Sequence, residues 1–181
     1  PGSFIHGARQ VAHVFPAQSP ECHEAIAACF TANTDREYDQ DPRFGLIVLS
    51  EIASRALSPA VNDPGTAIEV IGAGLRVLQA YSDAHADQEP PCFERLHAHD
   101  LETGELFDDF FNPIARDGAA LIEVQLRLQF ALEALAQGNA PLYSACARHH
   151  ATLALDRATA VLASAHDRSR LAQRADWIKA A

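Results

Sequence analysis

The sequence predicts a mainly α-helical protein, a bundle of five or six helices preceded by an N-terminal β-hairpin. Helices are favoured because a capping residue followed by proline recurs before long segments in which apolar residues repeat every three or four positions. The hairpin is favoured by an N-terminal run in which apolar residues alternate with others. With 181 residues, 48% of them hydrophobic, the chain can bury the core of one domain.

The N-terminal element, residues 1–16, is predicted to form the hairpin. Gly7 supplies a turn, and Pro16 ends the strand that follows. Every second residue of that strand lies on one face: Val11, His13 and Phe15. An isolated hairpin is only marginally stable in water, so this element needs the helices or another chain to cover it.

Residues 17–181 are predicted to form the helical part of the same domain. Helix-start signals stand at Ser19-Pro20, Asp41-Pro42, Asp63-Pro64, Asn112-Pro113 and Pro141. The expected helices cover residues 19–32, 42–57, 64–82, 113–138, 141–165 and 168–179, with a helical turn at 106–111. We expect a loop at 83–91, and a left-handed residue at Gly138-Asn139, where a helix ends.

Composition disfavours several classes of partner. The formal net charge of −10 disfavours nucleic acid and anionic membrane surfaces, because both are bound by basic patches. No apolar run reaches the roughly 18 residues of a membrane span. The chain starts at Pro1 and holds no Met, so we expect a fragment of a longer protein. The cysteines form no C-x-x-C pair and are expected to be free thiols in a reducing compartment: Cys22, Cys29, Cys92 and Cys146.

The most informative stretch is the polar turn between the second and third expected helices, residues 55–67. Ser58-Pro59 stops the first of these helices, because the residue before a proline avoids the α region. Asp63-Pro64 starts the next one. We predict that the Asp63 side chain caps this helix by accepting a backbone N–H from Gly65 or Thr66.

Polar residues at the ends of these helices form the candidate ligand-binding site. They are Arg36, Asp41, Arg55, Ser58, Asn62, Asp63 and Thr66. A helix N-terminus offers N–H donors and arginine adds a bidentate clamp, so the cluster could bind a small anion. The same residues could instead cap helices and hold the turn, with an ion pair between Arg55 and Glu51. If the two helices pack antiparallel, Asp41 and Asp63 lie at opposite ends and the cluster splits.

Other groups carry weaker signals, and no catalytic residue, metal or cofactor is expected. Ser58 precedes a proline and has no histidine nearby in the sequence, unlike a nucleophile elbow. His97-x-His99-Asp100 and His149-His150 match no zinc-binding spacing. Four acidic residues are expected to form a solvated face: Glu102, Glu105, Asp108 and Asp109.

The turn belongs to a longer ordered pattern. Upstream stand Arg36, Gln40-Asp41, Phe44-Gly45, Leu49 and Ile52-Ala53, followed by Arg55-Ala-Leu-Ser-Pro-Ala-Val-Asn-Asp-Pro64 and Thr66-Ala67. A second element is Pro1-Gly-Ser-Phe-Ile-His-Gly-Ala-Arg-Gln-Val-Ala12. Together they resemble the signature of a bacterial membrane-protein family, domain of unknown function 2254, over roughly residues 1–15 and 36–78. Glu37 and Val48 depart from a usual threonine and a common glutamine of that family.

The resemblance implies a soluble C-terminal domain, on the cytoplasmic side, of a protein whose N-terminal region spans the bacterial inner membrane. It implies no reaction. We therefore expect a non-enzymatic regulatory, assembly or ligand-sensing domain, whose partners are its own N-terminal transmembrane region and further copies of itself. The alternative is an enzyme domain that acts on a small anionic substrate through the Arg/Asp/Asn cluster. A structural turn should pair its polar groups internally, whereas a site should open to a pocket with arginine or asparagine donors unpaired.

Overall fold

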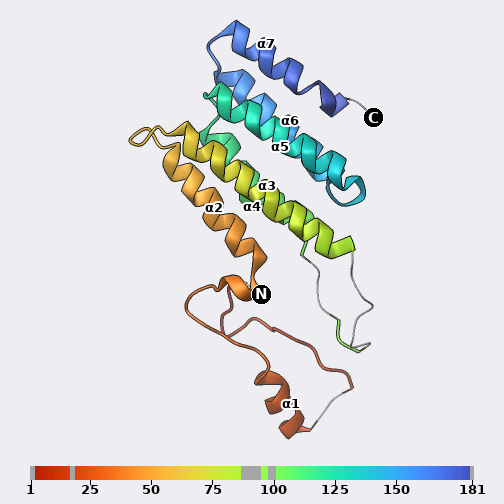
Figure 1. Ribbon diagram of the computed structural model, residues 1–181. Helices are drawn as coiled ribbons and strands as arrows, with labels where there is room; N and C mark the ends of the chain where they lie inside the picture. The colour runs from red at the N-terminus through yellow and green to blue at the C-terminus, as the bar shows by residue number, and fades with distance from the viewer. Residues whose placement is uncertain (1–2, 17–18, 87–94, 98–100, 180–181) are drawn as a thin grey trace. The chain divides into compact units, whose positions relative to one another are not determined.

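The computed structural model describes residues 3–16, 19–86, 95–97 and 101–179. These residues form seven α-helices and two 3-10 helices and hold no strand (Figure 1). In chain order the elements are α1 (Pro20–Ala27), η1 (Tyr38–Gln40), α2 (Pro42–Ala56), α3 (Pro64–Ala86), α4 (Thr103–Asp117), α5 (Ile122–Gly138), α6 (Ala140–Val161), α7 (Ala165–Arg174) and η2 (Asp176–Lys179). The predicted helical bundle is confirmed, with seven helices in these ranges rather than five or six. The chain divides into two compact units, the N-terminal unit Pro1–Phe44 and the C-terminal unit Gly45–Ala181.

The N-terminal unit contains no strand at residues 3–16, so the predicted β-hairpin is wrong for this part of the chain. One turn does form around Gly7. The Arg9 N–H donates to the His6 carbonyl over 2.9 Å, and the Arg9 guanidinium donates to the Phe4 carbonyl over 2.8 Å. The alternation of apolar and other residues predicts an extended backbone, but it does not provide a second strand to pair with. An extended segment without a paired strand does not form a sheet.

α1 is shorter than the predicted helix at residues 19–32. Its start is as expected, because the Cys22 N–H donates to the Ser19 Oγ over 3.4 Å. None of its eight residues is buried, so packing does not extend it. A short helix without a packed face is marginal in water, which accounts for its early end.

α2 and α3 begin at the predicted prolines, Pro42 and Pro64. α3 then continues to Ala86, past the predicted end at residue 82, while residues 87–91 of the predicted loop lie outside the described ranges. Leu78 and Ser82 are buried, so packing against the bundle carries the helix further than its polar last turn suggests.

The predicted helix start at Asn112-Pro113 is wrong, because Pro113 lies inside α4 and α5 begins at Ile122. An interior proline removes one helical hydrogen bond and costs about 3 kcal/mol. Burial along the same helix offsets that cost: the buried apolar residues of α4 are Leu106, Phe107, Phe110, Phe111, Ile114 and Ala115. α5 ends at Gly138 as predicted, but Asn139 has a φ of −144° and is not left-handed.

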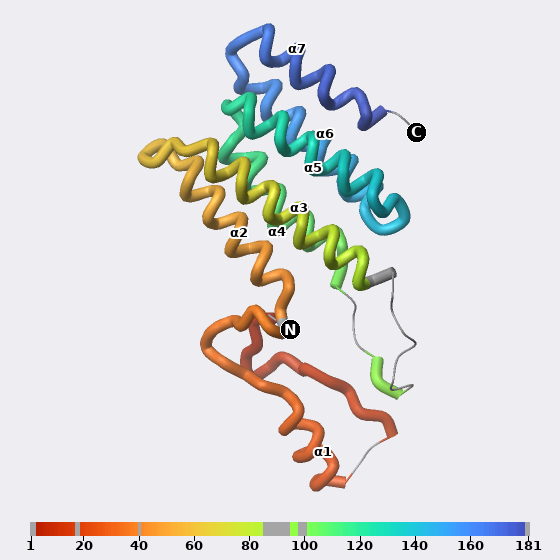
Figure 2. The backbone as a smooth tube through the Cα atoms, viewed as in Figure 1, coloured from red at the N-terminus to blue at the C-terminus, as the bar shows by residue number. Residues whose placement is uncertain are grey.

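The core of the C-terminal unit is formed by α3, α4, α5 and α6 together with Leu46 and Ala53 of α2. α3 packs against α5 and α4 packs against α6, so each pairs with the next helix but one along the chain. α5 and α6 also pack against each other, and α7 packs on both of them (Figure 2). Gly74 of α3 permits a close approach, because a Cβ atom there would lie 2.0 Å from the Cζ atom of Phe110. The Phe110 ring therefore packs directly on the backbone of α3.

Candidate functional site

The polar turn between α2 and α3 is built around Asp63. The Thr66 N–H donates to Asp63 Oδ1 over 3.1 Å, and the Thr66 hydroxyl donates to Asp63 Oδ2 over 2.6 Å. The predicted cap is thus confirmed at Thr66. The Thr66 hydroxyl, and next the Thr66 N–H, hold the pKa of Asp63 below its ordinary value. The Asp63 N–H donates back to the Ala56 carbonyl at the end of α2 over 2.8 Å, which ties the two helix ends together.

Ser58 and Asn62 shape the backbone of the same turn. The Ser58 hydroxyl donates to the Arg55 carbonyl over 2.7 Å, and the Ser58 carbonyl accepts the Asn62 N–H over 2.8 Å. Asn62 has a φ of 49°, a left-handed conformation that asparagine adopts more readily than most residues. Both residues therefore complete the C-terminal end of α2 and reverse the chain.

Arg36 and Asp41 form a second polar group, inside the N-terminal unit. The Arg36 Nε–H donates to Asp41 Oδ2 over 2.6 Å, and the Asp41 side chain is only 5% exposed. Asp41 Oδ1 also accepts the Phe44 N–H over 3.2 Å, which caps α2. The Arg36 guanidinium lies 5.2 Å from the centroid of the Phe44 ring, and that ring stacks on Tyr38. Asp41 therefore holds both the arginine and the helix start.

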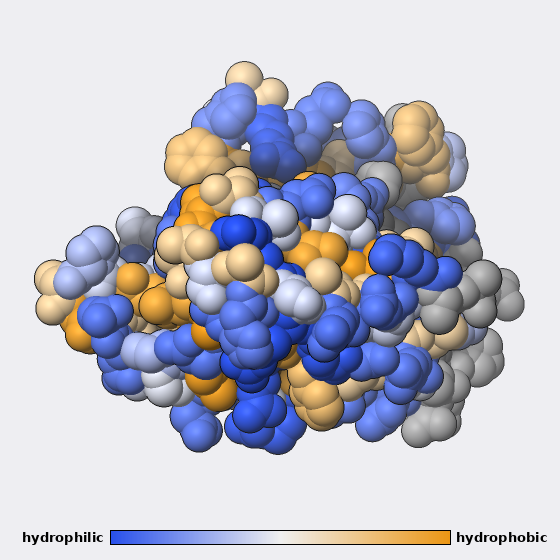
Figure 3. Space-filling view, turned by 90° about the horizontal axis from the view of Figure 1, so that it is seen from above, coloured by the Kyte–Doolittle hydropathy of each residue, from blue (hydrophilic) through white to orange (hydrophobic). Residues whose placement is uncertain are grey.

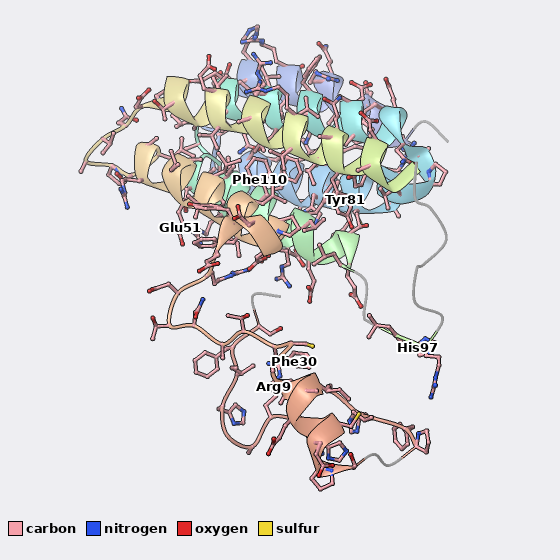
Figure 4. The ribbon with its side chains drawn as sticks, turned by 60° about the horizontal axis from the view of Figure 1, so that its bottom comes forward. Arg9, Phe30, Glu51, Tyr81, His97 and Phe110 are labelled. Carbon is pink, nitrogen blue, oxygen red and sulfur yellow. The ribbon has the colours of Figure 1, made fainter. Side chains whose placement is uncertain are left out.

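The seven predicted site residues thus fall into two groups, one before the start of the fifteen-residue helix α2 and one at and beyond its end. Arg36 and Asp41 precede α2, while the other five close its end or follow it. Arg55 is exposed, and its side chain pairs neither with Glu51, labelled in Figure 4, nor with any other described residue. The carboxylate of Asp63 already binds the first turn of α3, so the cationic group left over at the turn is Arg55.

Replacing Asp63 with alanine is expected to cost about 1 kcal/mol of folding free energy, because α3 loses its cap. For a chain of this size that corresponds to a fall of about 2–4 °C in melting temperature. Circular dichroism melting curves would measure it. Asp63→Asn keeps a capping oxygen and should lose less; an Asp63→Ala curve that coincides with the wild type would contradict the cap.

The histidines and acidic residues yield one cluster that the sequence does not predict. His150 of α6 is buried, with its Nε2 3.5 Å from Asp108 Oδ1 of α4 and its ring 5.7 Å from that of Phe107. Burial lowers the pKa of His150, so the ring favours its neutral form. Asp108 also accepts the side-chain amide of Asn112 over 2.7 Å, so it is not merely part of a solvated face. His99 and Asp100 lie outside the described ranges.

This cluster has neither the ligands of a metal site nor the electrostatics of a nucleophile. Cys146 lies one turn before His150 on α6, but burial and the charge of Asp108 both raise the pKa of its thiol. Within the described residues, no three His, Cys, Asp or Glu side chains are placed to hold a metal ion. Cys22, Cys29 and Cys146 are free thiols, while Cys92 falls outside the described ranges.

Comparison with known proteins gives a family and two partial relatives. A family model described as "Predicted membrane protein (DUF2254)" matches residues 1–134. An uncharacterized protein of Mycobacterium tuberculosis and one of Mycobacterium bovis are each 60% identical to the chain over 37 residues, 20% of this chain and 7% of each relative. The chain thus covers a small part of the length of these curated relatives. No solved structure matches significantly. Among the described helices, none combines the length and apolarity needed to cross a bilayer.

Proposed function

This chain belongs to the DUF2254 family of predicted membrane proteins, and we propose that it is a non-enzymatic assembly domain of a bacterial inner-membrane protein. In this proposal the domain is the soluble C-terminal part of that protein, lies on the cytoplasmic side, and joins its own transmembrane region to further copies of itself. Regulation or ligand sensing would act through the same contacts.

The observation that supports assembly rather than chemistry is how the polar groups of the turn are used. Asp63 binds Thr66, and the Ser58 hydroxyl binds a carbonyl of its own helix end. In the N-terminal unit, Asp41 binds Arg36. Side chains engaged in this way fix helix ends, and a substrate would have to displace them. A rigid turn that presents an exposed surface suits a contact between proteins.

Exposed apolar residues near the end of α2 are candidates for that contact. Ile52 of α2 is 43% exposed, and Val61 of the turn is 56% exposed. Figure 3 shows apolar residues scattered among hydrophilic ones on the face that it views. Single exposed apolar residues are common on protein surfaces, so the effect of each on association has to be measured.

We expect the chain to self-associate, with a mass in light scattering that rises above the 19.6 kDa of one chain as the concentration increases. Ile52→Asp and Val61→Asp should lower that mass, because a charge would be buried in the contact. Val161→Asp is the matched control, since Val161 is 53% exposed at the end of α6 and should leave the mass unchanged. A single-chain mass at every concentration would contradict assembly by self-association.

The second candidate function, binding or turnover of a small anion, is favoured by the exposed Arg55 guanidinium. If it binds such an anion, phosphate or sulfate should raise the melting temperature in proportion to RT ln(1 + [L]/Kd). Arg55→Lys should weaken that shift, because an ammonium does not replace a bidentate fork. Arg170→Lys, at another exposed arginine, is the control. Equal shifts in both variants would assign the effect to general ion binding.

A further inference from the structure

A cavity of about 220 Å³ lies within the C-terminal unit, away from the turn between α2 and α3. Its walls come from three helices: Gln79, Ser82 and Asp83 of α3, Leu135 and Gly138 of α5, and Tyr143 of α6. α3 and α5 both end beside it and α6 begins there, as the neighbouring ends of these helices in Figures 1 and 2 show. Figure 4 labels Tyr81, which precedes Ser82 on α3. The space accommodates several waters or one small organic molecule.

Two buried oxygens in its wall, those of Tyr143 and Ser82, keep lone pairs that can accept a hydrogen bond. Tyr143 is 1% exposed, and its hydroxyl donates to the Leu78 carbonyl over 2.7 Å. The Asn139 side-chain amide donates to the Ser82 Oγ over 2.7 Å. A phenol oxygen that has given its proton to a carbonyl can still accept, and a hydroxyl oxygen accepts two hydrogen bonds. The wall therefore offers acceptor oxygens on Tyr143, Ser82 and Asp83.

The electrostatics at this end of the unit favour a cation. The last carbonyl groups of a helix carry partial negative charge, and two helices, α3 and α5, end here. Asp83, an exposed residue, adds a full negative charge at the wall. At the opposing start of α6, two N–H donors are already occupied, because Asn139 accepts the Leu142 N–H at its side chain and the Tyr143 N–H at its carbonyl. Burial, and next the neighbouring Tyr81 and Asp83, raise the pKa of Tyr143, so its hydroxyl stays neutral and available.

From the cavity, the acceptor oxygens of Tyr143 and Ser82 and the charge of Asp83, we propose that this cavity binds a small organic ammonium ion. The N–H groups of a primary amine would donate to the Tyr143 and Ser82 oxygens, and Asp83 would balance the positive charge. The carbon chain would lie along Leu135. A bare metal ion would leave most of the space empty. This site is separate from the turn and does not rest on the assembly role.

Ethanolamine is the probe, titrated into the intact 181-residue chain and followed by chemical shifts of the cavity residues and by calorimetry. Asp83→Asn should weaken binding by about two- to fivefold, because it removes an exposed opposing charge and keeps the shape. Gly138→Leu should block the cavity; a Cβ atom at Gly138 meets nothing within 4 Å, so the larger side chain is tolerated by the fold. Asp156→Asn, an exposed α6 residue thirteen positions beyond Tyr143, is the matched control and should bind as the wild type does.

Three results would overturn the proposal. The first is no saturable response of the wild-type chain to ethanolamine, measured against potassium chloride at the same ionic strength. The second is equal affinity in Asp83→Asn and the wild type. The third is an equal response to tetramethylammonium, which carries the charge without N–H donors. Folding of each variant is checked by its melting curve, so lost binding in a folded Gly138→Leu chain supports the site.

Discussion

Replacing Phe110 with alanine is expected to lower the free energy of unfolding by about 3–5 kcal/mol. The Phe110 ring is fully buried, packs edge-on against Phe111, and lies against the backbone of α3 at Gly74. Removing it opens a void at a position where α3 and α4 hold the ring between them. Urea denaturation followed by circular dichroism would measure the loss.

A second prediction concerns Gly74, the residue of α3 that the Phe110 ring contacts. A Cβ atom there would lie 2.0 Å from the Phe110 ring, so Gly74→Ala forces the ring or a helix to move and should cost about 1–3 kcal/mol. In a Phe110→Ala background the clash is gone, and the same change should become neutral or stabilising, because alanine favours a helix over glycine. The double-mutant cycle measures this coupling. Gly104→Ala, where a Cβ atom meets nothing within 4 Å, is the control. Equal costs of Gly74→Ala in both backgrounds would show that contact with Phe110 is not the cause.

Replacing Asp41 with alanine should cost about 2–4 kcal/mol, since it removes the cap of α2 and a charge-assisted hydrogen bond together. The Arg36 side chain is 32% exposed and regains some water, which limits the loss. Hydrogen exchange at the Phe44 amide reports the cap, because that N–H donates to Asp41 Oδ1 as well as to the Asp41 carbonyl, and only the second bond remains in Asp41→Ala. Asp41→Asn keeps the capping oxygen and gives up the charge, so it should protect this amide better than alanine does. Equal exchange in the two variants would contradict the capping role.

Local sequence signals predicted several helix starts correctly, but they did not predict features that depend on contacts between distant parts of the chain. Asp41-Pro42 and Asp63-Pro64 begin helices because a cap and a proline act on the residues beside them. Asn112-Pro113 carries the same signal and yet lies inside α4, because buried apolar residues before and after it, such as Phe111 and Ile114, are held by contacts that no local pattern contains. Alternation at residues 11–15 marked extended backbone and could not supply a paired strand.

In the candidate site, too, local features could be predicted from the sequence and features made by distant residues could not. Asp63 as a cap follows from its place before Pro64, and its partner Thr66 lies three residues away. The cavity could not be predicted in this way, because the wall residues of α3 lie more than fifty positions before those of α5 and α6 in the sequence. The bond between Tyr143 and Leu78, 65 positions apart, is of this kind.

The pairing of α3 with α5 and of α4 with α6 has a consequence for how the C-terminal unit is assembled and divided. The stretch of chain between α3 and α5 contains α4, and the stretch between α4 and α6 contains α5. Both pairs therefore join the first half of the unit to the second. Neither the segment from α2 to α4 nor the segment from α5 to α7 contains a complete core. Each helix pair closes a long loop, and the chain loses the conformational entropy of that loop before the packing of the pair stabilises the fold. The unit should therefore fold in a single cooperative step, and that step requires α6 to be present. A cut in the connection at residues 118–121 would yield two fragments that each lack a complete core and should reach the native fold only on mixing.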